Sequence, residues 1–189
     1  MTSNQTRGRL TLLAIAALFA LPIVAAMYFY FADDGWRPGD RTQHGDLISP
    51  PRNLPEGPLT RGDDAPRFRE VWSLVVLAET QCDATCVDAL VKIRQVRLWL
   101  GPKINRMQTV LLPADSAILP EAVRAEHPKL IIADPSLSQS SRNIIGRYNN
   151  GQIFMVDPLG NVMMSYKPGV DMGDIRKDIG HLLRISNIG

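Results

Sequence analysis

Cysteine and net charge are both scarce in this sequence. Only two of its 189 residues are cysteines, too few for a disulfide scaffold or, by themselves, for a four-ligand zinc site. The formal net charge is +2, and without a basic stripe or an RNA-binding signature this excludes nucleic acid as an expected partner. The G-x-S-x-G, P-loop and H-E-x-x-H motifs are missing as well. What remains has the length of one ordinary domain with appendages.

A long apolar run stands near the N-terminus. Residues 10–31 read LTLLAIAALFALPIVAAMYFYF, 22 residues without a charge, and about 20 such residues span a bilayer as a helix. Arg7 and Arg9 lie just before the run, and two aspartates lie just after it. Because Lys and Arg prefer the cytoplasmic flank, we expect residues 1–9 in the cytoplasm and 10–31 as a transmembrane anchor.

A cleaved signal peptide is the alternative for this run. Val24 and Ala26 offer a small-residue cleavage site before Met27, but the apolar run is longer than the usual signal-peptide core. Both interpretations export residues 32–189. In a bacterium the destination is the periplasm, where disulfides form, and the anchored form is a single-pass protein of the inner membrane.

The segment after the anchor lacks any periodicity. Between Trp36 and Arg69 the chain carries six prolines and four glycines, a composition typical of a tether or an extended wrapping segment. We therefore assign residues 32–69 to a Pro/Gly-rich tether and residues 70–189 to the folded domain.

Within the domain, apolar strands alternate with helical patterns. Helices between buried strands, followed by a closing hairpin, predict a three-layer α/β sandwich. The expected strands are 72–78, 107–112, 130–133, 153–156 and 162–166, and the expected helices follow Cys82, cover 120–126, occupy the Ser-rich segment up to Tyr148, and begin after Asp171.

The two cysteines, Cys82 and Cys86, lie just beyond the first buried strand and at the start of a helix. Thr85 and Asp88 form a candidate capping box that would place Cys86 in the first helical turn, where a thiolate is stabilised. Asp83, if close, works against that effect. The spacing lets the pair cycle between dithiol and disulfide, hold Cu(I), or form a static disulfide that pins the turn, and these three interpretations stay open.

Several of these features together resemble the Sco/SenC family, the thioredoxin-fold, membrane-anchored factors of cytochrome c oxidase assembly. The features that carry the resemblance are an N-terminal anchor, a strand, a C-x-x-x-C motif at the start of a helix, and the late hairpin IFMVDPLGNVMMSY. The short Sco-like transmembrane proteins associated with bacterial cytochrome oxidase genes are the most similar, through His44–Leu47, Pro50–Arg52 and Cys82–Cys86. The resemblance implies a thioredoxin-like three-layer sandwich over about residues 70–186.

The family's copper site combines two cysteines with a histidine that precedes the hairpin strand. The resemblance therefore implies Cys82 and Cys86 as metal ligands and copper as a possible cofactor. Asn149 falls where the histidine would stand, and an amide is a poor substitute for imidazole toward copper. The proline that generic thioredoxin enzymes carry before this strand is also missing from 149–152, which favours a dedicated partner over broad oxidoreductase activity.

No other side chain is an obvious third ligand. His127 should lie at the opposite end of the sheet from the cysteines, and His181 should be a partly buried residue of the last helix. His44 lies in the predicted tether and could fold back toward the pair. Of Met163 and Met164, at least one is expected in the core.

The resemblance implies biogenesis of the copper site of a cytochrome c oxidase, with an oxidase subunit or a copper chaperone as partner. In that role Cys82 would be the attacking thiol and Cys86 the resolving one, so both are the candidate catalytic residues. Copper delivery through the same pair is a variant. The alternative from another class is a non-catalytic assembly scaffold with a structural disulfide.

Overall fold

The computed structural model divides the chain into two compact units, Met1–Asp40 and Arg41–Gly189. Each unit is described by itself. The residues that the structure describes are 3–31, 43–78, 81–114, 119–186 and 188.

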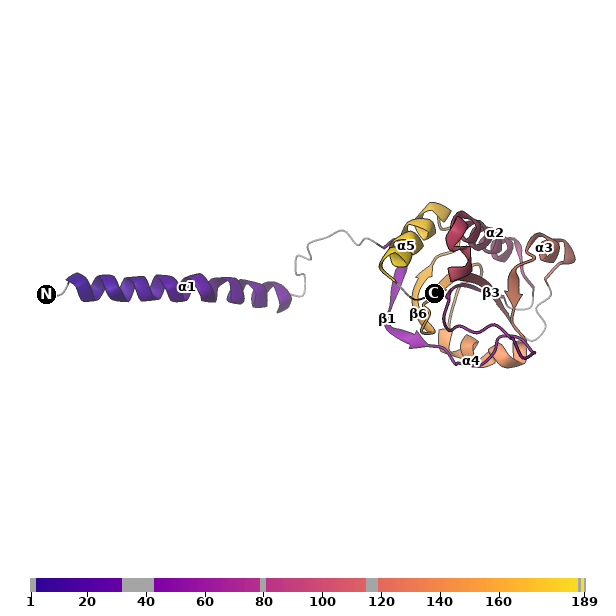
Figure 1. The fold of residues 1–189 in the computed structure, drawn as a ribbon, viewed down its shortest axis with the longest axis horizontal. Helices are drawn as coiled ribbons and strands as arrows, with labels where there is room; N and C mark the ends of the chain where they lie inside the picture. Colours follow the sequence, from indigo (N-terminus) through magenta and orange to yellow (C-terminus); the bar gives the residue numbers. More distant parts are fainter. Residues whose placement is uncertain (1–2, 32–42, 79–80, 115–118, 187, 189) are drawn as a thin grey trace. The chain divides into compact units, whose positions relative to one another are not determined.

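The first unit contains one helix, α1 (Ser3–Phe31). Its segment Arg7–Phe29 is long and apolar enough to cross a membrane by length and composition, and its apolar side chains are exposed throughout. A single proline, Pro22, stands inside the helix, which a spanning helix tolerates. The predicted helix over 10–31 is confirmed, and it begins several residues earlier than predicted (Figure 1).

The second unit is built on one mixed sheet of six strands, in the order β1-β6-β5-β2-β3-β4. Strands β2, β3 and β4 pair in parallel, while β5, β6 and β1 add antiparallel strands on the other side of β2. The bounds are β1 Asp46–Asn53, β2 Trp72–Ala78, β3 Met107–Pro113, β4 Leu130–Ile132, β5 Ile153–Val156 and β6 Asn161–Tyr166.

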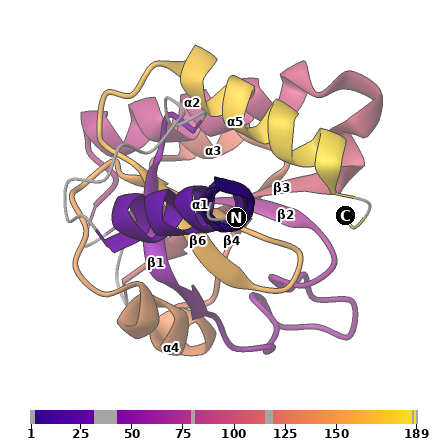
Figure 2. The ribbon, with the colours of Figure 1, turned by 90° about the vertical axis from the view of Figure 1, so that its left-hand side faces the viewer.

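Helices cover both faces of this sheet, with α2 and α5 on one face and α4 on the other (Figures 1 and 2). The predicted three layers are thus confirmed. Alternate residues of β2 enter two separate cores: Leu74 and Val76 pack with α2 and α5, while Val75 and Leu77 pack on the side of α4. The helices are α2 Ala84–Trp99, the 3-10 helix η1 Gly101–Arg106, α3 Glu121–Glu126, α4 Pro135–Ile145 and α5 Met172–Ile185.

Much of the segment assigned to the tether belongs to the second unit, which begins at Arg41 rather than at residue 70. Strand β1 pairs with β6 at the sheet edge, and the loop after it buries Leu54, Leu59 and Phe68 in the core on the α4 side. The strand pattern was missed because the ladder is irregular between Leu47 and Arg52. Two adjacent prolines stand there, and proline has no N–H for the ladder.

A tight turn joins β5 to β6, as the Asp-Pro-Leu-Gly sequence predicts. Gly160 N–H donates to the Asp157 carbonyl oxygen at 2.9 Å, and Gly160 has a φ of +84°, which glycine adopts without strain. The Asp157 carboxylate also accepts from the backbone N–H groups of Leu159 and Asn161. These bonds fix the connection between the end of β5 and the start of β6.

Candidate functional site: the cysteine pair

The candidate site lies where the chain leaves β2 and enters α2. Cys82 and Cys86 form a disulfide with a Cα–Cα distance of 5.1 Å, within the range that disulfides occupy. The two residues differ in access, because Cys82 is 8% exposed whereas Cys86 is completely buried. Cys82 is therefore the candidate for first contact with an incoming thiol or disulfide.

Asp83 is the N-cap of α2. Its carboxylate accepts a hydrogen bond from Cys86 N–H at 2.9 Å, so the predicted capping box of Thr85 and Asp88 is wrong. Asp88 instead pairs with Lys92 at 2.7 Å. Cys86 still lies in the first turn, but a carboxylate occupies the helix terminus that would otherwise stabilise a thiolate there.

The turn before β5 packs directly on the first turn of α2. A Cβ added to Gly151 would lie 2.6 Å from Thr85 Cγ2 and 2.7 Å from the Thr85 carbonyl oxygen, and Gly151 has a φ of +73°. Only glycine fits this approach. Asn149, which the resemblance to Sco/SenC proteins matched to their copper histidine, is an exposed residue of this turn, and its N–H donates to Gln152 Oε1 at 3.0 Å.

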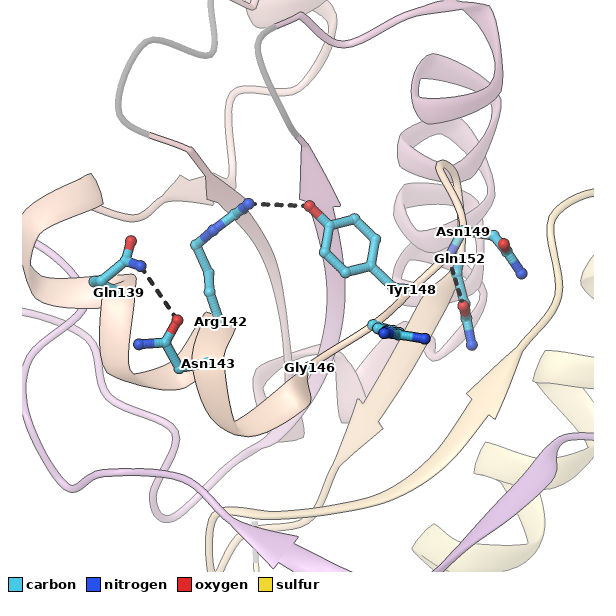
Figure 3. A pocket seen from close by; sticks show the side chains of 8 residues that line it. Gln139, Arg142, Asn143, Gly146, Tyr148, Asn149 and Gln152 are labelled. Carbon is cyan, nitrogen blue, oxygen red and sulfur yellow. Dashed lines mark hydrogen bonds between the residues drawn. The ribbon is translucent and has the colours of Figure 1, made fainter.

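A polar cleft of about 800 Å³ opens between α4 and this turn (Figure 3). Sequence reasoning missed its central residue, Arg142. The Arg142 guanidinium donates to the carbonyl oxygens of Ala78 and Leu112, at the ends of β2 and β3, and to Tyr148 Oη at 3.0 Å. Its contacts join residues far apart in sequence, which no local pattern signals. The lining residues are Gln139, Arg142, Asn143, Gly146, Arg147, Tyr148, Asn149 and Gln152.

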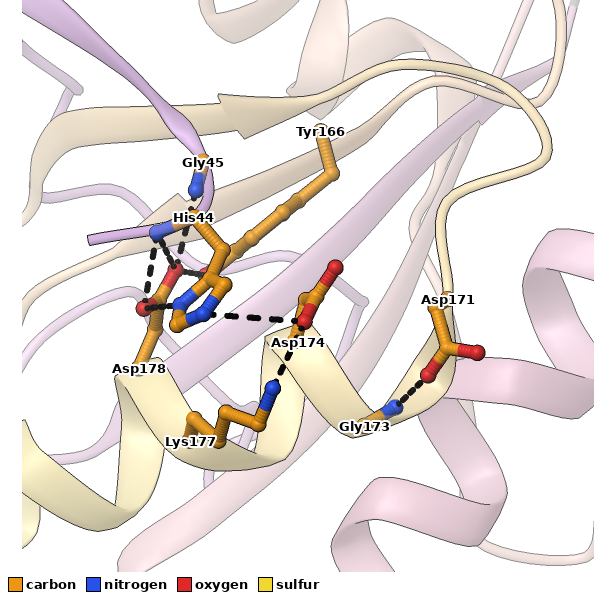
Figure 4. A network of polar contacts seen from close by, with 8 residues as sticks. All are labelled: His44, Gly45, Tyr166, Asp171, Gly173, Asp174, Lys177 and Asp178. Carbon is orange, nitrogen blue, oxygen red and sulfur yellow. Dashed lines mark hydrogen bonds and ion pairs between the residues drawn. The ribbon is translucent and has the colours of Figure 1, made fainter. Parts of the chain in front are cut away.

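His44 does not fold back onto the cysteines. Its backbone N–H donates to both carboxylate oxygens of Asp178 at 3.0 Å, and its Nδ1 lies 2.9 Å from Asp178 Oδ1 (Figure 4). Gly45 N–H and Tyr166 Oη donate to the same carboxylate at 3.0 and 3.1 Å. Burial, followed by the charge of Asp178, raises the pKa of the Tyr166 phenol. The network holds the start of the second unit on α5.

The remaining candidate ligands lie elsewhere. His127 is buried just before β4, at the end of the parallel strands opposite the cysteines, as predicted. Burial, and then the charge of Arg94, lowers its pKa. His181 is exposed on α5, so the prediction of partial burial is wrong, and Met164 is the predicted core methionine.

Among the residues that the structure describes, the reduced pair would offer copper two sulfur donors and no third strong ligand. Thiolates suit Cu(I), so the reduced pair fits a two-sulfur site for that ion. Across the described ranges, no group of three His, Cys, Asp or Glu side chains is placed to hold a metal.

Solved structures with this fold include several Sco proteins. The apo Sco1 protein from Thermus thermophilus matches with a TM-score of 0.56 and 19% identity, over 74% of this chain and 96% of that one. A SCO1/SenC family lipoprotein from Bacillus anthracis matches with 0.52 and 15%, over 72% and 99%. Yeast Sco1 with copper bound matches with 0.51 and 12%, over 63% and 79%. These similarities show a thioredoxin-type fold.

No curated protein matches the chain. A family model described as "Transmembrane-like, thioredoxin-like, C-terminal domain" matches residues 72–186. This stretch runs from the start of β2 through α5 and contains both cysteines. The fold, the N-terminal apolar helix and this match agree, and the chain belongs to the transmembrane-like, thioredoxin-like C-terminal domain family.

Proposed function

We propose that this protein is a membrane-anchored thiol–disulfide exchange protein that serves the copper site of a cytochrome c oxidase. The observation that carries the proposal is the disulfide of Cys82 and Cys86 at the start of α2, in which Cys86 is completely buried and Cys82 retains 8% exposure. A pair placed in this way suits exchange with another protein.

The exchange step follows from the unequal access of the two sulfurs. In the reduced protein, the Cys82 thiolate attacks one sulfur of a partner disulfide and displaces the other sulfur as a thiolate. The Cys86 thiolate then attacks Cys82 Sγ, closes the internal disulfide and releases the partner's second thiolate. Two electrons pass to the partner, whose thiolates take protons from water. The reverse sequence oxidises a partner dithiol.

The resolving step needs Cys86 next to Cys82 at short range. The Cα–Cα distance of 5.1 Å and the Asp83 cap on Cys86 N–H hold that geometry. The difference in exposure between the two residues favours Cys82 as the attacking group.

Location and partner follow from the anchor and the family resemblance. With α1 spanning the bacterial inner membrane and its N-terminus in the cytoplasm, the second unit lies in the periplasm, where disulfide exchange takes place. The partner is then an oxidase subunit or a copper chaperone with a cysteine pair. Copper-bound yeast Sco1 shares the fold and supports a copper-linked role.

Cu(I) is the cargo in the variant of this proposal. Reduced Cys82 and Cys86 would hold the ion between two sulfurs and pass it on to a partner that offers more ligands. Asn149 adds no strong ligand, so binding should be weaker than in a site that carries the histidine. A weakly held cargo is suited to transfer.

The test uses the full chain in non-ionic detergent and an oxidised partner domain with one cysteine pair. Cys86→Ser should accumulate a mixed disulfide through Cys82, whereas the matched variant Cys82→Ser should accumulate none. The dithiol–disulfide potential is measured against glutathione. A potential below about −300 mV with no mixed disulfide would overturn exchange and favour the assembly scaffold with a structural disulfide. Copper titration of the reduced chain, with the double serine variant as control, tests the cargo variant.

A further inference from the structure

A second surface, at the opposite end of α2 from the cysteines, combines an exposed tryptophan with basic side chains. Helix α5 and the C-terminal end of α2, which lie side by side (Figure 1), border a groove of about 460 Å³. We name it the α5 groove. Its lining residues are Trp99, Gly173, Arg176, Lys177, Gly180, His181 and Arg184.

Trp99 is the apolar centre of the α5 groove. The side chain is 51% exposed, although tryptophan is a residue that folding normally buries. It packs against Gly180, whose missing Cβ would lie 3.4 Å from Trp99 Cη2, and the Arg176 guanidinium lies 5.5 Å from its ring centroid. The leucine before Trp99 and the isoleucine after Arg184 are exposed as well.

Positive charge surrounds this tryptophan. Arg176, Lys177 and Arg184 line the groove, and Lys103 joins Trp99 and Arg184 in an adjoining pocket of about 290 Å³. No acidic residue lines either pocket among the described residues. One of these cations is paired, because Asp174 Oδ1 lies 3.1 Å from Lys177 Nζ. The charge of the groove therefore favours an anionic surface.

The chain joins the second unit at this same helix. His44 lies near the start of the second unit and contacts Asp174 and Asp178 of α5. Only twelve residues separate it from the end of α1 at Phe31, so the chain from Phe31 to His44 reaches at most about 47 Å when fully extended. A surface of modest affinity is enough to dock a domain that is tethered so closely to a bilayer.

We propose that the α5 groove docks on the anionic phospholipid head groups of the bilayer that holds α1. Tryptophan prefers the level of the head groups, and each Lys or Arg near an anionic leaflet adds to the attraction. Docking would hold the thioredoxin-like unit at a fixed height over the membrane, near membrane-embedded partners. The inference rests on the proposed membrane span and is independent of the cysteine chemistry.

The test places the full chain in vesicles and measures quenching of Trp99 fluorescence by lipid brominated high on its acyl chains. Trp36 is replaced by phenylalanine in every protein tested. The two remaining tryptophans are then Trp99, which is exposed, and Trp72, which is buried. Quenching should be strong when a quarter of the lipid is phosphatidylglycerol. It should fall in pure phosphatidylcholine, and it should fall again in high salt.

The matched variants differ only in where they remove charge. Arg176→Gln with Arg184→Gln should lower the ratio of docked to free domain roughly thirtyfold. Arg124→Gln with Lys129→Gln removes the same charge outside the α5 groove and should leave quenching unchanged. Equal quenching in both lipids, or equal loss in both double variants, would overturn the proposal, as would an acidic protein partner binding the groove independently of lipid.

Two readouts separate this proposal from the exchange proposal. Flotation with the vesicles reports the membrane span directly, and a chain that does not float overturns docking. Serine at both Cys82 and Cys86 removes exchange and should leave the lipid-dependent quenching intact. Loss of quenching in that variant would contradict an independent docking surface.

Discussion

The carboxylate of Asp178 should be one of the most important polar groups for the stability of the second unit. Asp178 is 3% exposed and accepts hydrogen bonds from His44, Gly45 and Tyr166. Replacing it with alanine removes the acceptor and leaves the donors in place. A buried donor that loses its partner costs free energy, since water cannot reach it.

The size of the effect follows from which donors are buried. Gly45 N–H and Tyr166 Oη are both in buried residues, and each unpaired buried group costs about 1–3 kcal/mol. His44 is partly exposed, so its own groups regain water. Asp178→Ala should therefore lower the free energy of unfolding by about 2–6 kcal/mol, which corresponds to a fall of roughly 10 °C in Tm for a unit of this size.

Asp174→Asn is the matched control. Asp174 lies one turn away on α5 and also faces His44, with Oδ1 3.7 Å from Nε2, but its carboxylate is partly solvated. The control should cost less than about 1 kcal/mol. Thermal unfolding of the full chain in detergent, followed by Trp72 fluorescence, compares the two. If Asp178→Ala falls within 1 kcal/mol of the control, the buried-donor reasoning is refuted.

Three further predictions concern other buried contacts. Gly151→Ala should destabilise the second unit by about 2–4 kcal/mol, because the added Cβ would overlap with Thr85 and the residue has a positive φ. The control Gly57→Ala, which has open space around it, should change stability little. Chemical denaturation measures the free energy of unfolding of both variants. Because burial and a neighbouring arginine hold the pKa of His127 below its ordinary 6.5, the unfolded chain binds its proton first, and stability should fall as pH drops through about 6.5. His127→Gln should remove that part of the pH dependence, and an unchanged slope would contradict it. Arg142→Ala should cost about 2–3 kcal/mol through its lost bonds to the ends of β2 and β3, and a loss below 1 kcal/mol by the same measurement would contradict this role.

The sequence predicted the elements whose apolar residues form continuous or periodic patterns. Strand β2 is buried on both faces, and its apolar run matches the observed bounds. Strand β1 was missed because it lies at the sheet edge, is mostly exposed and contains two prolines. An edge strand with an irregular ladder shows little alternation of apolar and polar residues in its sequence. The apolar residues after β1 are isolated from one another, so their sequence is typical of a loop.

For the candidate site, the sequence predicted the cysteine pair but not its surroundings. The i, i+4 spacing predicted that the two sulfurs could approach each other, and the structure joins them. The N-cap was assigned to Thr85 because a capping box is a strong local signal, but Asp83 is itself a good cap and stands two residues earlier. The contacts of Arg142 and His44 join distant segments, and local patterns carry no information about them.

The asparagine at position 149 links the two proposed activities of the cysteine pair. A strong third ligand at this place would keep copper on the thiolates and withdraw them from exchange. Under the proposed function, an amide there would leave the thiolates available to a partner disulfide and leave Cu(I) to the two sulfurs. Gly151 keeps this turn against α2, so the replacement of an imidazole by an amide would lower copper affinity without a change in the backbone of the turn. We therefore expect the pair to serve exchange and transfer rather than storage of copper.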